Sequence, residues 1–133
     1  MSLSKEQSER YARNLALREV GIQGQEKLRE AKVLIIGAGG LGSPAAMYLA
    51  AAGIGTLGIA DGDRVDVSNL QRQILHTDED TGRAKVFSAR ETLNRLNPEV
   101  TVHAYETTVT DANIMNLIAD YDFILDASDN FET

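Results

Sequence analysis

The chain of 133 residues contains no cysteine. These residues therefore provide no disulfide, no zinc–thiolate site and no cysteine nucleophile, and the absence agrees with the cytoplasmic protein that we expect. Basic side chains are also in deficit, because 20 Asp and Glu outnumber 13 Lys and Arg and leave a net charge of -7. A broad basic surface is thereby excluded, so we expect no nucleic-acid partner, although a local basic pocket is compatible with this charge.

Long uninterrupted hydrophobic runs are missing as well. The longest apolar stretch, residues 44–60, is interrupted by Gly53, Gly55 and Gly58, which is typical of a helix, a turn and a buried strand. The first ten residues carry no apolar signal core. We therefore expect no membrane partner. With 43% hydrophobic and 25% charged residues, the chain has the composition of one globular domain with a sizeable core.

Residues 1–31 are predicted to form an N-terminal helical arm. Ser4 and Gln7 fit a capping box, which predicts a helix that begins there. Gly21 and Gly24 are expected to interrupt helical structure. The expected helices of the arm are residues 4–17 and 25–30.

Residues 32–133 are predicted to form an α/β domain. Short apolar strands alternate with helical stretches, which predicts a Rossmann-like parallel sheet in the order 3-2-1-4 with helices on both faces. The last strand needs a cover that residues 127–133 only begin, so we expect the N-terminal part of a larger domain. The expected strands are residues 33–36, 56–60, 100–105 and 121–125, and the expected helices are residues 40–52, ended by Gly53, residues 83–96, and residues 112–119, capped by Asp111.

A glycine-rich turn follows the first expected strand. Gly37, Gly39 and Gly42 fit the pattern Gly-x-Gly-x-x-Gly, and a helix is expected to begin at Gly40. Such a turn brings the backbone and the positive end of a helix close to a phosphate. The pattern alone favours a nucleotide, with a dinucleotide as the default. The alternative is a turn that serves only close packing of a helix on a strand.

An acidic residue ends the second expected strand. Asp61 lies twenty-four residues after Gly37, where a carboxylate typically binds the hydroxyl groups of a ribose. The alternative is a carboxylate that caps its own loop. Asp63 and Asp66 are interpreted as solvent-facing or turn residues.

A polar segment, residues 68–73, lies in the long irregular connection between residues 62 and 82. It offers several hydrogen-bond donors, and Arg72 can hold a phosphate with two hydrogen bonds. Lys85 lies at the start of a helix, where the helix dipole disfavours it, so neutralising phosphates is one use for it. The alternatives are an exposed polar turn and a solvated lysine. His76 is interpreted as structural or exposed rather than as a base.

Two carboxylates follow the fourth expected strand. Asp129 is the candidate ligand of Mg2+, which proteins hold through one or two carboxylates plus phosphates. Asp126 is equally compatible with a cap of a turn or helix. Nothing in the local pattern distinguishes Arg13 from a solvated helix residue, and His103 is interpreted as structural.

Taken in order, these motifs resemble the ThiF/MoeB/HesA group of the ubiquitin-activating-enzyme superfamily. The resemblance implies an ATP- and Mg2+-dependent adenylyltransferase acting on the C-terminal glycine carboxylate of a small ubiquitin-like sulfur carrier, as in molybdopterin or thiamin synthesis. It also implies a homodimer and a structural zinc site for which this chain has no ligands. The resemblance rests on residues 10–14, 37–42, 61–63, 68–73 and 128–130.

The resemblance also implies a role for each matching position. Residues of the glycine turn would approach ATP, and Asp61 would hold its ribose. Arg72 and Lys85 would contact the phosphates and act in catalysis, and Arg13 would reach the site of the other subunit. The remaining implied nucleotide contacts are Gly37, Gly39, Gly40, Ser68, Asn69, Leu70, Gln71, Asp129 and Asn130. Of these, Asp129 would also bind Mg2+.

Two other functions remain open at this point. The glycine pattern with Asp61 also fits an NAD-dependent oxidoreductase, in which Arg72 and Lys85 have no clear role. A non-catalytic homologue that binds a nucleotide or a partner is the second alternative.

Overall fold

The computed structural model describes residues 3–128. Its centre is a four-stranded parallel sheet in the order β3-β2-β1-β4, which confirms the predicted order. Val33 of β1 lies between Leu57 of β2 and Phe123 of β4 in the register. The strands are β1 (Lys32–Ile36), β2 (Thr56–Ala60), β3 (Thr101–Tyr105) and β4 (Phe123–Asp126).

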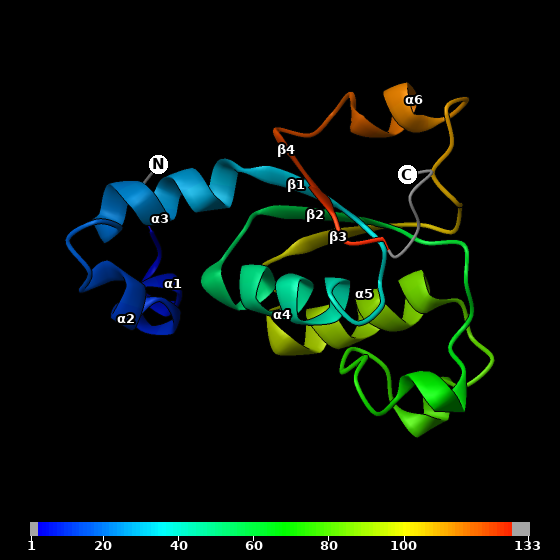
Figure 1. Ribbon diagram of the computed structural model, residues 1–133. Coiled ribbons are helices and arrows are strands. Elements are labelled where there is room, and N and C mark those ends of the chain that lie inside the picture. The colour runs from blue at the N-terminus through cyan, green and yellow to red at the C-terminus, as the bar shows by residue number, and fades with distance from the viewer. Residues whose placement is uncertain (1–2, 129–133) are drawn as a thin grey trace.

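Helices cover both faces of this sheet, as Figure 1 shows. Helices α4 (Gly42–Ala52) and α5 (Lys85–Leu96) lie together on one face, and the short α6 (Ile114–Ile118) lies on the other. Three N-terminal helices lie near the amino end of β1, opposite the edge where β1 ends. They are α1 (Lys5–Arg10), α2 (Ala12–Leu15) and α3 (Gly21–Glu30), and two short 3-10 helices, η1 (Val67–Asn69) and η2 (Asp78–Asp80), lie in the long connection after β2.

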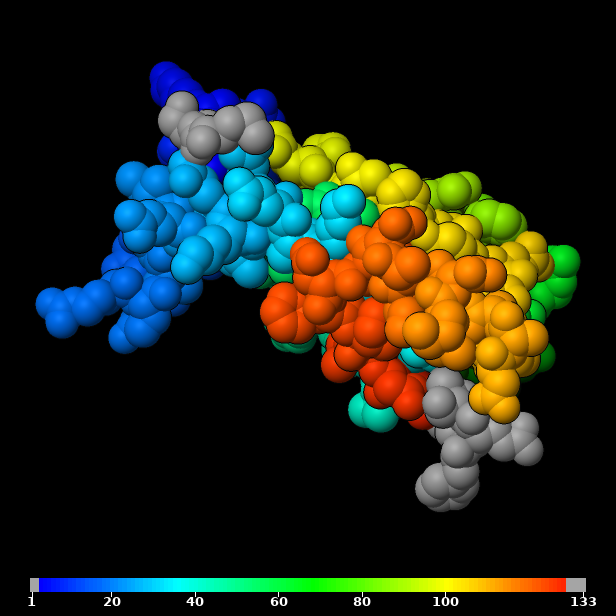
Figure 2. Space-filling view, turned by 90° about the horizontal axis from the view of Figure 1, so that it is seen from above, coloured from blue at the N-terminus to red at the C-terminus, as the bar shows by residue number. Residues whose placement is uncertain are grey.

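The central strand β1 is apolar on both faces. Val33 and Ile35 belong to the core beneath α4 and α5, whereas Leu34 and Ile36 belong to a smaller core that α6 and Tyr121 cover. Burial on both faces is what a central strand of a parallel sheet requires. By contrast β4 pairs only with β1 among the described residues, and Phe123 is 66% exposed. Figure 2 shows β4 and α6 side by side on the surface seen from above.

The glycine turn brings α4 unusually close to β1. Gly37 has a φ of +102°, and a Cβ there would lie 2.8 Å from the carbonyl oxygen of Ala127. A Cβ on Gly42 would overlap the carbonyl oxygen of Gly37. Two of the three glycines are therefore required by backbone packing, whatever the turn binds. At its other end α4 stops at Gly53, in the left-handed conformation, as predicted.

The N-terminal helices differ from the prediction in their boundaries. The capping box of Ser4 and Gln7 is present, but the helix breaks at Tyr11 instead of continuing to residue 17. Tyr11 is 2% exposed and its hydroxyl accepts a hydrogen bond of 2.9 Å from Asn97, so packing of this ring bends the chain. The helix predicted at residues 25–30 is part of α3, which begins at Gly21 and includes Gly24, so neither glycine interrupts it.

Other boundaries shift by a few residues. Helix α6 begins after Asn113 rather than at residue 112 and is not capped by Asp111, because the Asn113 amide folds back to bond Thr110 and Thr108. The observed starts of α4, α5, β3 and β4 are each one or two residues later than expected, at Gly42, Lys85, Thr101 and Phe123.

Buried polar groups tie the N-terminal helices to α4. Gln25 of α3 is fully buried, accepts a hydrogen bond from Asn14 and donates one of 2.8 Å to the carbonyl of Ala52. The division into an arm of residues 1–31 and a domain of residues 32–133 stays a prediction. Within residues 3–128, no helix combines the length and the apolar character needed to cross a membrane.

Replacing Tyr11 by phenylalanine tests the link between the first helices and α5. The substitution keeps the buried ring but leaves one Asn97 N–H without its acceptor, which costs about 1–2 kcal/mol of unfolding free energy. Urea denaturation measures this loss. Tyr48→Phe is the matched control. Tyr48 is 77% exposed, so loss of its hydroxyl should leave the free energy of unfolding unchanged. Equal stability of the two variants would contradict the role of the Tyr11 hydroxyl.

Candidate active site

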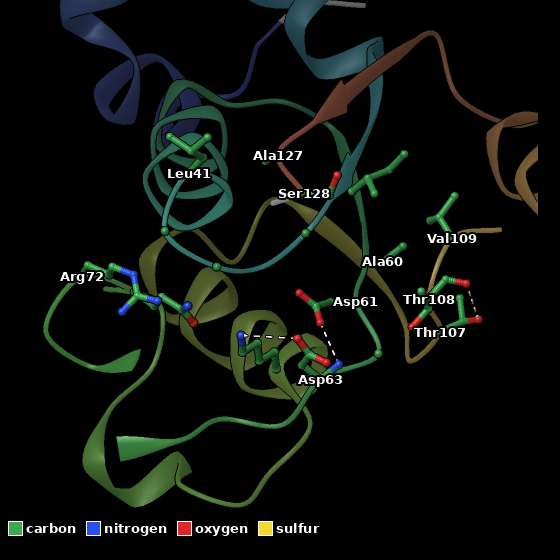
Figure 3. A pocket seen from close by; sticks show the side chains of 17 residues that line it. Leu41, Ala60, Asp61, Asp63, Arg72, Thr107, Thr108, Val109, Ala127 and Ser128 are labelled. Carbon is green, nitrogen blue, oxygen red and sulfur yellow. Dashed lines mark hydrogen bonds and ion pairs between the residues drawn. The ribbon is translucent and has the colours of Figure 1, made fainter. Parts of the chain in front are cut away.

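A pocket of about 510 Å³ lies at the carboxyl ends of the central strands. Its walls are the glycine turn after β1, the residues that follow β2, the turn at Arg72, the start of α5, and residues 107–109 after β3 (Figure 3). Chain direction places this edge where the strand order reverses around β1, the position at which open parallel sheets bind ligands.

The glycine turn presents unused backbone donors to this pocket. The N–H groups of Gly37 and Ala38 are bonded to Ala60 and Asp61. For the N–H groups of Gly39 and Gly40, the structure gives no acceptor within residues 3–128. Both glycines line the pocket, next to the start of α4, where the helix dipole adds positive potential. The turn is therefore suited to an anion.

Asp61 fastens the glycine turn to the loop after β2. Its Oδ2 accepts a hydrogen bond of 2.8 Å from the Ala38 N–H, and its Oδ1 accepts one of 2.8 Å from the Asp63 N–H. The carboxylate is thus a loop cap, the alternative noted above. It also lines the pocket, and each oxygen keeps a lone pair for a hydroxyl group of a ligand.

Lys85 is buried at the floor of the pocket. Its side chain is 8% exposed, so it is not the solvated lysine of the alternative reading. Its nearest carboxylate, Asp63, is 4.0 Å away and itself 79% exposed. Within residues 3–128 the structure gives the ammonium group no hydrogen-bond acceptor. Figure 3 shows this long ion pair as a dashed line. Burying an ammonium group without a close partner costs free energy, and a bound anion would offset that cost by pairing with the charge.

Arg72 and Gln73 form the wall facing the glycine turn. Arg72 is exposed, lies beside Gly40 and donates to the Ser68 carbonyl at 3.3 Å. Gln73 is 4% exposed, and its Oε1 atom has no hydrogen-bond partner among the described residues. Because Arg72 is exposed and its bond to Ser68 is long, its guanidinium group is free to turn toward a ligand.

The rest of the polar segment does not line the pocket. Ser68 donates from its backbone and its hydroxyl to the Asp66 carboxylate, at 2.9 and 2.7 Å, and these bonds lower the pKa of Asp66. Asp66 thereby caps η1, as expected of a turn residue. The predicted nucleotide contacts that lie outside the pocket lining are Ser68, Asn69, Leu70 and Gln71; their roles stay predictions.

Four other residues considered in the sequence analysis lie outside the pocket lining or outside the described residues. Asp126 accepts bonds of 3.0 and 2.6 Å from Ser128, which lower its pKa and give it the role of a turn cap. Asp129 and Asn130 lie outside the described residues. Arg13 is exposed on α2, at the end of the molecule opposite the pocket (Figure 1).

No group of three or more His, Asp or Glu side chains among residues 3–128 is arranged to hold a metal ion. Mg2+ that is bound mainly through phosphates needs only one or two protein carboxylates. The small number of carboxylates at the carboxyl ends of the strands is therefore compatible with an Mg2+ ion bound in this way.

Two features of the site were missed by sequence reasoning. Thr107 and Thr108 line the pocket from the loop after β3, and topology alone marks that loop, since it follows the carboxyl end of a strand. His76 is 4% exposed and bonds both the glycine turn and α5.

His103, which the sequence analysis interpreted as structural, is exposed on β3.

Known proteins share this sequence and this fold. The probable adenylyltransferase/sulfurtransferase MoeZ of Mycobacterium tuberculosis is 49% identical over 132 residues, which are 99% of this chain and 34% of that protein. The sulfur carrier protein adenylyltransferase of Thermus thermophilus is 48% identical over 133 residues, which are 100% of this chain and 49% of that protein. The chain thus spans between a third and a half of these curated relatives.

A solved structure matches closely as well. The E. coli tRNA N6-threonylcarbamoyladenosine dehydratase TcdA, in complex with ATP, superposes with a TM-score of 0.90 at 30% identity, over 98% of this chain and 53% of that one. The model of the ThiF family matches residues 11–133. The resemblance drawn from the motifs is confirmed, and the chain belongs to the ThiF family.

Proposed function

We propose that this chain forms the nucleotide-binding part of an ATP-dependent adenylyltransferase. The reaction would join AMP to the C-terminal glycine carboxylate of a ubiquitin-like sulfur carrier ending in Gly-Gly and release pyrophosphate. The observation that carries the proposal is the buried ammonium group of Lys85, which lines the pocket without a close anion. The names of the Mycobacterium and Thermus relatives support the type of reaction.

Each wall of the pocket has a role in this reaction. The N–H groups of Gly39 and Gly40 would bind phosphate oxygens, and Asp61 would accept hydrogen bonds from the ribose. The attacking carboxylate and the α-phosphate are both anionic, so Arg72 and Lys85 would offset their repulsion and stabilise the pentacoordinate transition state. No general base is required, because a carboxylate is already ionised at neutral pH.

A magnesium ion would add to this charge compensation when bound. Asp129, with Asn130 beside it, is the residue that we propose to hold the ion together with the phosphates. Residues 68–71 would border the nucleotide on the η1 side.

The two cationic side chains of the pocket, Arg72 and Lys85, favour a triphosphate over a dinucleotide. An NAD-dependent oxidoreductase would use the glycine turn and Asp61, but hydride transfer has no use for a buried lysine next to an arginine. A non-catalytic homologue would keep the pocket without turnover, and the exchange measurement below distinguishes it from the enzyme.

The assembly follows from the family resemblance. We propose a homodimer in the cytoplasm in which Arg13 of one subunit reaches the phosphates in the other. In support, Arg13 is exposed and, within residues 3–128, makes no ion pair. The carrier would serve molybdopterin or thiamin synthesis, and a structural zinc ion would belong to other parts of the protein, since this chain has no cysteine.

Exchange of pyrophosphate into ATP by the full-length protein tests the function. We expect exchange that requires the carrier with its Gly-Gly end. Lys85→Met should lower the rate roughly a hundredfold, equivalent to about 3 kcal/mol of lost transition-state stabilisation. Because the substitution also removes a buried charge with no close partner, its melting temperature should equal or exceed that of the wild type.

Lys27→Met is the matched control, because Lys27 is exposed on α3 and should be neutral in both measurements. Carrier binding without exchange in the wild type would contradict the proposed function. Exchange at the normal rate in Lys85→Met would contradict the role of the lysine.

Mixing two inactive variants tests the role of Arg13 across the dimer. Arg13→Ala and Lys85→Met each damage every site of their own homodimer, but a mixed dimer contains one site with both defects and one intact site. After random subunit exchange, activity should recover to about a quarter of the wild-type value. Recovery is measured as exchange activity after co-refolding or co-expression. If Arg13→Ala alone is inactive and the mixture gains nothing, Arg13 acts within its own subunit.

A further inference from the structure

Side chains of two different loops hold the two polar backbone groups of Ala38, whose carbonyl belongs to the peptide between Ala38 and Gly39. The Ala38 N–H donates to Asp61 Oδ2 at 2.8 Å, and the Ala38 carbonyl lies 2.9 Å from Nε2 of His76. His76 comes from the connection between Arg72 and η2, so this contact joins a distant segment to the glycine turn. Glycines at positions 39 and 40 leave the backbone here free to rotate, so the orientation of this peptide depends on such contacts.

The hydrogen bonds of His76 define its tautomer. A carbonyl oxygen only accepts, so Nε2 carries the hydrogen and donates it to Ala38. The other nitrogen, Nδ1, lies 2.8 Å from the hydroxyl oxygen of Ser88 on α5, and in a neutral ring it is the acceptor in this contact. Both ring nitrogens are therefore satisfied in a neutral imidazole that is 4% exposed.

Burial lowers the pKa of His76 below its ordinary value. The nearby Lys85 on α5 acts in the same direction, whereas the hydrogen bond to Ala38 and the carboxylates of Asp80 on η2 and Asp61 after β2 oppose it. The ring is thus neutral at pH 7, and its contact with Ala38 adds no charge to the pocket.

The direction of the Gly39 N–H follows from peptide geometry. No cis peptide bond occurs among residues 3–128, and in a trans peptide the carbonyl of Ala38 and the N–H of Gly39 point to opposite sides. The carbonyl faces the buried His76, and Gly39 lines the pocket. A flip of this peptide would turn a carbonyl oxygen toward the ligand in place of a donor.

We infer that His76 is a positioning residue for nucleotide binding, which locks the Ala38–Gly39 peptide so that the Gly39 N–H faces the phosphates. This inference rests on the proposed function. His76 does not touch the nucleotide; it acts through the backbone of the glycine turn. It also links that turn to α5, the helix that begins with Lys85.

Two isosteric variants separate positioning from packing. Glutamine places an N–H near the position of Nε2 and can still donate to Ala38, whereas asparagine places its amide near Nδ1, keeps the contact with Ser88 and falls short of Ala38. Both lose the buried ring, so their melting temperatures should fall alike. We expect His76→Asn to raise the Kd for ATP roughly tenfold and His76→Gln to bind nearly as the wild type does.

The tautomer is measured without any ligand. Nitrogen-15 NMR of the wild type at pH 7 should show neutral His76 with hydrogen on Nε2. Hydrogen on Nδ1, or equal ATP affinity of the two variants, would overturn the positioning role while leaving the proposed function intact. Failure of the wild type to bind ATP would overturn the proposed function and this role with it.

Discussion

The ammonium group of Lys85 is held inside the protein, 4.0 Å from an exposed carboxylate and beside unused backbone N–H groups. The other features of the pocket are consistent with binding an anion that would pair with this ammonium group. Asp61 already accepts from two backbone N–H groups, and Arg72 lies at the rim with only a carbonyl bond of 3.3 Å. A chain with a net charge of -7 therefore places two cationic side chains, Arg72 and Lys85, in one pocket beside Asp61 and Asp63. An anionic ligand is the natural complement of the two cationic side chains and the free N–H groups.

Close backbone packing makes the arrangement possible. Gly42 lies against the carbonyl of Gly37, so the start of α4 approaches the end of β1 at a distance that only glycine permits. Asp61 and His76 then hold the N–H and the carbonyl of the next residue, Ala38, one from the loop after β2 and the other from the connection toward α5. The positions of the donors thus depend on two long-range contacts and on glycine packing, rather than on the turn alone.

The order of the sheet was predictable because each strand is a short apolar run bounded by polar or glycine residues, and right-handed crossovers then leave one arrangement. Boundaries were less predictable where tertiary contacts override local preference. Tyr11 breaks a helix because its ring is buried and its hydroxyl pairs with Asn97, which lies 86 residues away in the sequence. Gly24 lies within α3 despite its low helix propensity, at a position where a Cβ would lie 3.2 Å from a side-chain carbon of Val20. Asn113 takes the position expected for Asp111 by bonding back to its own loop.

For the site, the sequence indicated which residues meet at the sheet edge but not how deeply they lie. Topology placed Gly39 and Asp61 there, and the family resemblance added the roles of Arg72 and Lys85. The burial of Lys85 depends on how α5 packs, which no local pattern encodes. His76 was interpreted as structural or exposed, and the structure shows it buried. Its contact with Ala38 spans 38 residues and could not be found from residue spacing. The predicted contacts at residues 68–71 lie outside the pocket lining and stay predictions; Ser68 bonds Asp66.

A crystal structure of the full-length protein with ATP tests the central claim most directly. The account predicts phosphate oxygens about 3 Å from Lys85 Nζ and from the N–H groups of Gly39 and Gly40, as expected of charge-assisted hydrogen bonds. It also predicts that Ala38 keeps its carbonyl on His76. ATP bound with its phosphates away from Lys85, and the ammonium group still facing only Asp63, would contradict the account.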